Sequence, residues 1–284
     1  MIRRLAGAVV ATAAGVTVLT AAGTAQAAPG APAAPERRQV DFTGIVALSN
    51  CSGSLVRGPR SQDSDRALVL TNGHCLEGGM PGAGEVVVDK PSTRAFTLLD
   101  PTGRKELGTL KATRLEYATM TDTDVAVYRL ADSYAKIRAE HKIDALKLSP
   151  AHPREGAEIS IVSGYWKKIY SCKIDGFVHR MREADWTWKD SIRYTPGCDT
   201  IGGTSGSPIV DRNTRQVVGI NNTGNEEGKR CAMNNPCEVD EEGKVTVRKG
   251  VNYGQQTYTL TRCLGEDNDV VLGGTCALPR PATG

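Results

Sequence analysis

The chain contains only four histidines, so a general base has few candidates. His141 lies on a solvated helix face and His152 in a proline-rich linker. His179 lies in a strand, where a surface or half-buried role is expected. His74 differs, because it follows the apolar run 68–70 closely and stands next to Cys75. A rigid strand would deliver its ring into a turn, and a catalytic base needs such a fixed orientation. From these residues alone, His74 is either a general base or a structural histidine.

The segment 202–208, with the sequence GGTSGSP, could supply a nucleophile. Its glycines permit a tight turn with positive φ in which main-chain amides converge. Ser205 lies within this turn, where its hydroxyl could attack a carbonyl group while the amides bind the developing oxyanion. An ordinary Gly/Ser loop is the alternative. The Gly-x-Ser-x-Gly elbow of α/β-hydrolases is excluded, because the residue two after Ser205 is Ser207.

Asp124 is the carboxylate that could orient the histidine. It opens the apolar strand 125–130, and a charge that leads into a buried strand is costly unless it has a partner. Asp122 lies outside the apolar run and is expected to be solvated. An acid, a base and a nucleophile of these types can together cleave an acyl bond.

Four segments together resemble the signature segments of chymotrypsin-like serine proteases, which have the trypsin fold. In chain order they are Cys51-Ser52-Gly53-Ser54-Leu55-Val56, Thr71-Asn72-Gly73-His74-Cys75, Asp124-Val125-Ala126-Val127 and Gly203-Thr204-Ser205-Gly206-Ser207-Pro208. The order His, Asp, Ser is that of the family. Within it, the ending Gly-x-Ser-Gly-Ser-Pro is similar to that of bacterial secreted peptidases related to the glutamyl endopeptidases. The resemblance covers about residues 41–262.

The resemblance implies a role for each residue of the site. Ser205 would attack the peptide carbonyl, His74 would take and return the proton, and Asp124 would hold His74 in the correct tautomer. The amides of Gly203 and Ser205 would form the oxyanion hole. These roles would make the chain a serine endopeptidase that acts on protein or peptide substrates.

The resemblance also implies that Cys51 and Cys75 form a disulfide beside the histidine loop. For the other six cysteines we expect the pairs Cys172–Cys198, Cys231–Cys237 and Cys263–Cys276, although sequence alone does not choose among the possible connectivities. The cysteines and histidines lack the spacing of a metal site, so we expect neither a metal nor a cofactor. The segment 238–249 begins like a calcium loop, but its twelfth residue is Lys249, which favours a charged hairpin turn.

Specificity depends on residues near the nucleophile turn. Asp199 lies six residues before Ser205, where trypsin-like enzymes have the carboxylate that binds Arg or Lys of the substrate. This implies cleavage after basic residues, or a structural aspartate as in some bacterial relatives. Glutamyl endopeptidases have a histidine where this chain has Asn221, which disfavours glutamate specificity. The next residues, Asn222, Thr223 and Gly224, are expected to pair with the substrate backbone by strand addition.

Short runs of Val, Ile, Leu, Thr and Tyr separated by Gly, Pro, Asn and Asp must position these residues. Such punctuation predicts an all-β fold, and we expect two six-stranded antiparallel β-barrels side by side, with the active site in the cleft between them. One charged, amphipathic helix is predicted over 133–143, where it connects the two halves. The expected domains are 41–148 and 149–262, followed by a disulfide-tied tail, 263–284. The expected strands are 43–48, 53–56, 67–71, 85–88, 125–130, 158–162, 176–180, 208–210, 216–221 and 256–260.

The 284-residue chain is 39% hydrophobic and 24% charged, which excludes a disordered tail and a multi-span membrane protein. The net charge of +3 is too small to indicate a nucleic-acid partner. Arg3 and Arg4, the apolar run 5–22 and the small-x-small site 25–27 have the layout of a secretory signal peptide. A membrane anchor is the alternative reading of this run. Export would place the cysteines where disulfides persist, so we expect a secreted monomer with no membrane association after signal cleavage.

Residues 28–40 are predicted to be a propeptide or linker, because residues 28–38 are rich in Pro and Ala and lack hydrophobic periodicity. Thr204 stands where the digestive enzymes have an aspartate that pairs with a freed N-terminal amine. That activation is therefore absent, and the enzyme is either competent once folded or restrained as a zymogen by residues 28–38.

Two other function classes stay open. One is a catalytically inactive secreted binding protein on the same fold, although all three residues of the triad are present. The other is a carbohydrate-binding module, for which Trp166, Trp186 and Trp188 are the candidate platforms. Core packing would explain Trp166 equally well.

Overall fold

The computed structural model describes residues 39–282. The expected signal peptide, 1–27, and residues 28–38 of the expected propeptide lie outside the described residues. In the described part, no helix is long and apolar enough to cross a membrane.

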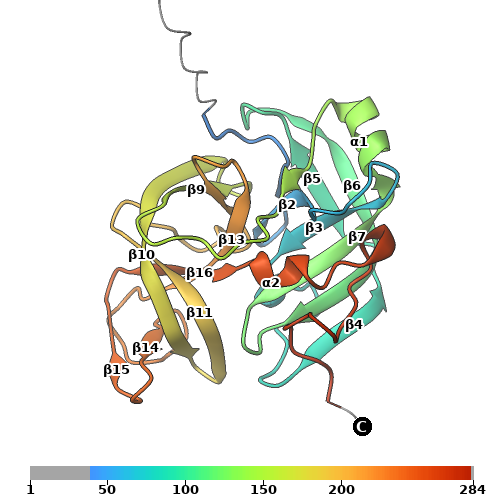
Figure 1. Ribbon diagram of the computed structural model, residues 1–284. Coiled ribbons are helices and arrows are strands. Elements are labelled where there is room, and N and C mark those ends of the chain that lie inside the picture. The colour runs from blue at the N-terminus through green and yellow to red at the C-terminus, as the bar shows by residue number, and fades with distance from the viewer. Residues whose placement is uncertain (1–38, 283–284) are drawn as a thin grey trace, which may run out of the picture. The chain divides into compact units, whose positions relative to one another are not determined.

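Eight strands of the first half form one sheet, and six of them close into an antiparallel barrel (Figure 1). The strands are β1 (Ile45–Ala47), β2 (Ser52–Arg57), β3 (Arg66–Thr71), β4 (Val86–Pro91), β5 (Ala95–Leu99), β6 (Glu106–Thr119), β7 (Val125–Ser133) and β8 (Leu146–Lys147). The ring runs β1-β5-β6-β7-β3-β2 and closes where β2 pairs with β1. Outside the ring, β4 pairs with β6, and β8 is a parallel partner of β2.

The second half also forms an eight-stranded sheet with a closed ring of six strands. Its strands are β9 (Glu158–Ser163), β10 (Lys168–Glu183), β11 (Trp186–Tyr194), β12 (Pro208–Asp211), β13 (Val217–Gly224), β14 (Cys237–Val239), β15 (Val245–Thr246) and β16 (Asn252–Gln256). The ring runs β11-β16-β13-β12-β9-β10 and closes where β10 pairs with β11, while β14 and β15 extend it from β10. The predicted all-β fold with two six-stranded barrels is confirmed.

β3 shows why the apolar runs become strands. Its alternating residues face two cores, because Ala67 and Val69 pack inside the first barrel while Leu68 and Leu70 pack in the cluster between the barrels. Both faces of the strand are therefore covered, which explains a continuous apolar run rather than an alternating one. β3 ends at Thr71, so this rigid, buried strand fixes the position of the backbone that leads to His74.

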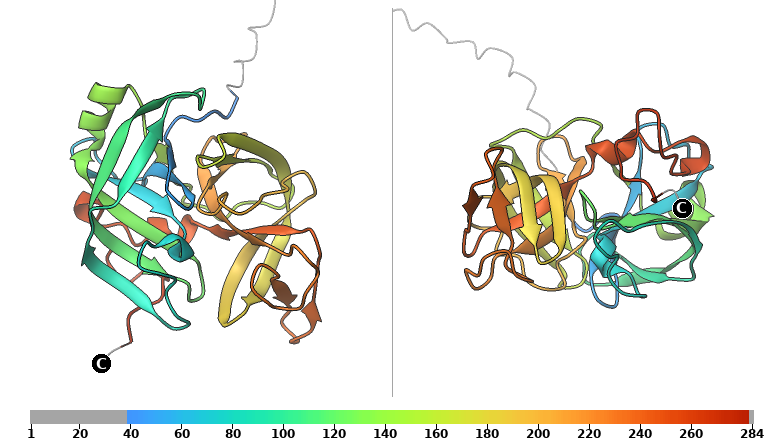
Figure 2. Two further views of the ribbon diagram at one scale, coloured as in Figure 1. Left: turned by 180° about the vertical axis from the view of Figure 1, so that it is seen from behind. Right: turned by 90° about the horizontal axis from the view of Figure 1, so that it is seen from below.

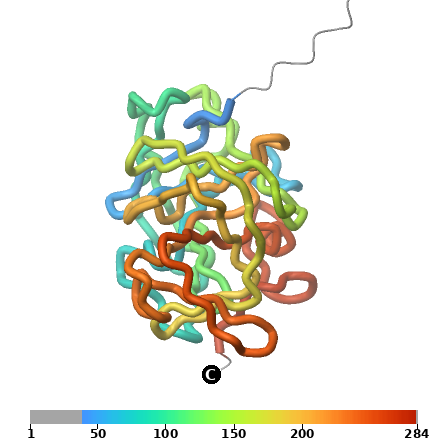
Figure 3. Tube along the Cα trace, turned by 90° about the vertical axis from the view of Figure 1, so that its left-hand side faces the viewer, coloured from blue at the N-terminus to red at the C-terminus, as the bar shows by residue number. Residues whose placement is uncertain are grey.

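The cluster between the barrels draws residues from both halves and from the tail. Ile45 and Leu70 of the first barrel meet Val210 and Ile220 of the second, together with residues 260–278. Figure 2 shows the red C-terminal segment beside the first barrel in both views, and the Cys263–Cys276 disulfide lies within the cluster. The chain leaves the first half after β8 and enters the second at β9, and the orange and red parts of the tube in Figure 3 follow it toward the C-terminus.

The predicted helix is confirmed as α1 (Tyr134–His141), and Ser133 caps it by accepting a hydrogen bond from the Lys136 amide. The strand expected over 256–260 is wrong. β16 ends at Gln256, and a helical turn, α2 (Tyr258–Thr261), follows, together with the short 3-10 helices η1 (Gly73–Cys75) and η2 (Glu266–Asn268) elsewhere. The turn buries Leu260 in the cluster between the barrels and leads to Cys263.

Candidate active site

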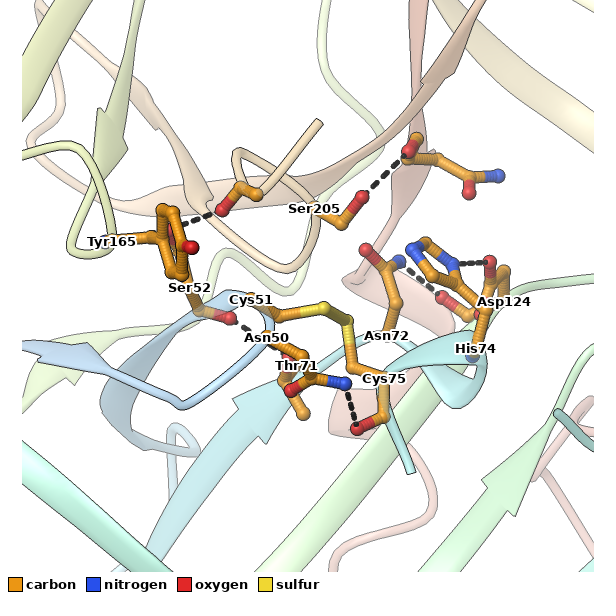
Figure 4. The surroundings of a disulfide bond; sticks show 12 residues. Asn50, Cys51, Ser52, Thr71, Asn72, His74, Cys75, Asp124, Tyr165 and Ser205 are labelled. Atoms are coloured by element: carbon orange, nitrogen blue, oxygen red, sulfur yellow. Dashed lines mark hydrogen bonds and ion pairs between the residues drawn. A yellow bond between two sulfur atoms is a disulfide. The ribbon is translucent and has the colours of Figure 1, made fainter. Parts of the chain in front are cut away.

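The histidine loop is held at the end of β3 by a disulfide and by a buried amide. Cys51 and Cys75 are joined across 24 residues, and Figure 4 shows this bond beside the loop. The Asn72 side chain donates a hydrogen bond of 2.8 Å to the main-chain oxygen of Asp124. η1 then places the His74 ring with 19% of its side chain exposed.

Asp124 is fully buried, and among residues 39–282 only His74 makes hydrogen bonds to its side chain. Its Oδ2 lies 2.6 Å from His74 Nδ1, and its Oδ1 accepts a 3.1 Å hydrogen bond from the His74 amide (Figure 4). Two contacts to one residue fix both the position and the rotation of the carboxylate. Since Asp124 accepts at Nδ1, the free electron pair of a neutral ring lies on Nε2.

The charge around His74 favours its protonated form. Burial alone would lower the pKa of His74, but the charge and hydrogen bond of Asp124, together with the charge of Glu183, raise that pKa above its ordinary value. A ring with this environment holds a proton well, as a base must during an acyl transfer.

Ser205 lies in the turn between Thr200 and β12, which two glycines make possible. Gly203 has φ +87° and Gly206 has φ +78°, both in the left-handed region. A Cβ on Gly206 would also lie 2.2 Å from Thr71 Oγ1, so this turn packs directly on the first barrel. The main-chain oxygen of Ser205 accepts a 2.8 Å hydrogen bond from the Ser52 amide, and Ser52 follows Cys51 of the disulfide that holds the histidine loop.

The Ser205 hydroxyl donates to the Asn222 main-chain oxygen at 3.3 Å and makes no hydrogen bond to His74 (Figure 4). Both side chains nevertheless line one cleft between the barrels. The structure thus brings His74, Asp124 and Ser205 together, with the third member turned toward β13.

The peptide between Gly202 and Gly203 is oriented by an indole. Trp166 is 48% exposed and is therefore not part of the core. Its Nε1 donates a 2.7 Å hydrogen bond to the main-chain oxygen of Gly202. In a trans peptide the next amide points the opposite way. Within the described chain neither the Gly203 amide nor the Ser205 amide donates to a protein acceptor, so both are free for the predicted oxyanion hole.

The cleft has a volume of about 90 Å³, which is smaller than the pockets that bury a drug-sized ligand. The four residues Asn221, Asn222, Thr223 and Gly224 line it, and their pairing with the substrate backbone stays a prediction. Asn221 and Asn222 are buried, and Tyr194 donates to Asn221 Oδ1 at 3.3 Å.

Asp199 is not brought into the cleft. Its side chain is exposed, and the wall of the cleft begins with the next residue, Thr200, which donates to Asn252 Oδ1 at 3.0 Å. At the position where the sequence led us to expect the carboxylate of Asp199, the cleft wall is therefore formed by the uncharged side chain of Thr200.

The other six cysteines form the disulfides Cys172–Cys198, Cys231–Cys237 and Cys263–Cys276, the pairs expected from the sequence. Cys51, His74 and Cys75 lie close enough to share a metal ion, but both sulfurs belong to the disulfide and offer no thiolate. Four disulfides are typical of an oxidising compartment outside the cytoplasm.

The sequence did not single out one group in this cleft. Glu183, at the end of β10, is 4% exposed and lines the cleft with His74 and Ser205. A glutamate that ends a strand next to a turn carries no motif, and its place depends on how β10 and β11 cross the second barrel.

A family model described as a trypsin-like peptidase domain matches residues 51–220, more than half of the chain. The chain belongs to the trypsin-like peptidase family. No curated protein matches the sequence. The family supports a proteolytic function and protein or peptide substrates, while the glutamyl endopeptidase subgroup stays a prediction.

Solved structures of proteases are similar to this trypsin-like peptidase. The MamO protease domain from Magnetospirillum magneticum has a TM-score of 0.50 at 11% identity, covering 80% of this chain and 98% of that one, which supports the fold. The Rv3671c protease from M. tuberculosis in its active form has a TM-score of 0.48 at 15% identity, with coverages of 85% and 87%. Protease Anisep from Arthrobacter nicotinovorans has a TM-score of 0.44 at 18% identity, with coverages of 77% and 91%.

Proposed function

We propose that the protein is a secreted serine endopeptidase that cleaves peptide bonds through Ser205, His74 and Asp124. The observation that carries the proposal is the 2.6 Å contact between His74 Nδ1 and the buried Asp124 carboxylate, in a cleft that Ser205 also lines. This contact leaves Nε2 as the basic nitrogen, the state in which the ring can accept the Ser205 proton.

The reaction begins when Ser205 rotates its hydroxyl from the Asn222 oxygen toward His74 Nε2. His74 removes the proton as Oγ attacks the substrate carbonyl, and the amides of Gly203 and Ser205 bind the oxyanion. His74 then gives the proton to the leaving amine, which breaks the peptide bond and leaves an acyl-enzyme on Ser205. Water, deprotonated by His74, releases the acid and restores the hydroxyl.

Secretion is part of the proposal, because the N-terminal layout of residues 1–27 and the four disulfides both favour export. Residues 28–38 would be a removable propeptide, with Arg37–Arg38 as a processing point. Monomeric action and cleavage after Arg or Lys complete the predicted activity.

The purified mature chain should hydrolyse an unfolded protein substrate, and Ser205→Ala should abolish this. Ser207→Ala is the matched control, since Ser207 is buried in the same turn and has no role in the proposed reaction. Hydrolysis by Ser205→Ala at the wild-type rate would contradict the mechanism. Intact folding of both variants with no hydrolysis by the wild type would favour an inactive binding protein.

A further inference from the structure

The buried carboxylate of Glu183 has a hydrogen-bond partner for only one of its two oxygens within the described protein. One carboxylate oxygen, Oε1, accepts a 2.8 Å hydrogen bond from the Asn234 amide. The other, Oε2, is buried and has no hydrogen-bond partner within the described protein. The side chain is 4% exposed and lines the cleft that holds His74 and Ser205.

Half-paired buried carboxylates are costly, and they persist where something else uses the charge. Burial raises the pKa of Glu183, and the nearby Thr223 hydroxyl, the Asn234 amide and His74 act against this rise. The Thr223 hydroxyl does not reach hydrogen-bond geometry with Oε2. A cation from outside the chain would supply the missing partner.

The rest of the cleft wall suits a cation. Glu226 adds a second carboxylate at the rim, and none of the residues that line the cleft is a lysine or an arginine. The partly buried indole of Trp186 also lines the cleft, and indole rings attract ammonium and guanidinium groups. The buried Oδ1 of Asn222, another hydrogen-bond acceptor, also lacks a partner within the described protein.

We infer that Glu183 selects substrates with a lysine or arginine side chain close to the scissile bond, by accepting hydrogen bonds from its charged end. This inference rests on the proposed function and names the substrate class for the same cleft. It gives the cationic preference to Glu183, which lines the cleft, rather than to Asp199, which is exposed outside it.

A purely structural role for Glu183 predicts something different. If the carboxylate only held the Asn234 loop, Glu183→Gln would keep an acceptor for the amide and would change all substrates equally. A specificity role predicts a loss confined to cationic substrates.

The experiment is a peptide-library profile of three proteins: the wild type, Glu183→Gln and Asp185→Asn. The last is the matched control, because Asp185→Asn also removes one negative charge from this hairpin, and Asp185 is exposed outside the cleft. The wild type should prefer Lys or Arg at one position near the cut. Glu183→Gln should lower kcat/KM for those peptides about 10- to 100-fold, the range for a lost hydrogen bond to a charged group, and should change neutral peptides little. Asp185→Asn should keep the preference.

Three outcomes would overturn the inference: a wild type without a basic preference, an equal loss for basic and neutral peptides in Glu183→Gln, or loss of the preference in Asp199→Asn instead. If Glu183→Gln does not fold, the wild-type profile and Asp199→Asn still decide.

Calorimetry on the Ser205→Ala variant separates this inference from the proposed function, because it requires no turnover. An arginine peptide should bind at least tenfold more tightly than its norleucine counterpart, and equal binding refutes the role of Glu183. Such selective binding combined with an inactive wild type would refute the proposed function and leave the assignment of Glu183 intact.

Discussion

Replacing Asp124 by asparagine tests how the carboxylate controls the tautomer of His74. Oδ1 accepts from the His74 amide, so an asparagine must keep its own oxygen at that position. Its NH2 group then takes the place of Oδ2, which lies 2.6 Å from Nδ1. Because an amide nitrogen only donates, Nδ1 must become the acceptor, and the ring proton moves to Nε2.

This inversion sets the magnitude of the effect. With a proton on Nε2, His74 cannot accept the proton of Ser205, and the imidazolium that forms during attack loses its counter-charge. The same replacement in the template Ser-His-Asp enzyme lowers kcat about 10⁴-fold. At about 1.36 kcal/mol per tenfold, the expected loss is about 5 kcal/mol of transition-state stabilisation. The pKa of His74 should also fall, because burial then acts without the charge of Asp124.

The assay combines kcat/KM on a peptide substrate with ¹⁵N NMR of the His74 ring. Asp122→Asn is the control, since Asp122 pairs with Lys189 at the surface and its positive φ suits asparagine. The control should keep activity within about twofold. Asp124→Asn with activity within tenfold of wild type, or with the proton still on Nδ1, would refute this reasoning.

Three further predictions concern the same site. Because the pKa of His74 is raised, the acidic limb of the pH profile of kcat/KM should lie above pH 6.5. Glu183→Gln should move this limb to lower pH, since it removes a negative charge that favours the protonated ring. An acidic limb that does not move in Glu183→Gln would contradict the electrostatic coupling. Gly206→Ala should lower the melting temperature by several degrees and remove activity, since its Cβ would lie 2.2 Å from Thr71 Oγ1; a stable, active variant contradicts the packing. Trp166→Phe should lower kcat about tenfold with little change in KM, because the Gly202 oxygen loses its donor; a change in KM alone would show a binding role instead.

The sequence predicted the strands that are buried on both faces, because such strands are continuous runs of apolar residues. Apolar runs such as β3 and β7 are covered on both faces and are visible without the structure. β6 and β11 were missed, because exposed charged residues interrupt them on the face that remains in water. The turn at Tyr258 was mistaken for strand because Leu260 is buried by the tail, a contact that local periodicity does not record.

The site divides in the same way. His74, Asp124 and Ser205 each stand in a short motif, so the sequence could name them, while the orientation of the Ser205 hydroxyl toward Asn222 depends on how its turn packs against β13. Asp199 was chosen for its spacing from Ser205, yet spacing does not fix which way a loop side chain faces. Glu183 has no motif, and only the crossing of β10 over the barrel brings it into the cleft.

The most direct test of the central claim is labelling of the mature protein with a fluorophosphonate, followed by mass spectrometry of the modified peptide. The account predicts one adduct on Ser205, lost in His74→Ala and in Ser205→Ala, with both variants folded. An adduct on another residue, or equal labelling of folded His74→Ala, would contradict the claim that His74 activates Ser205.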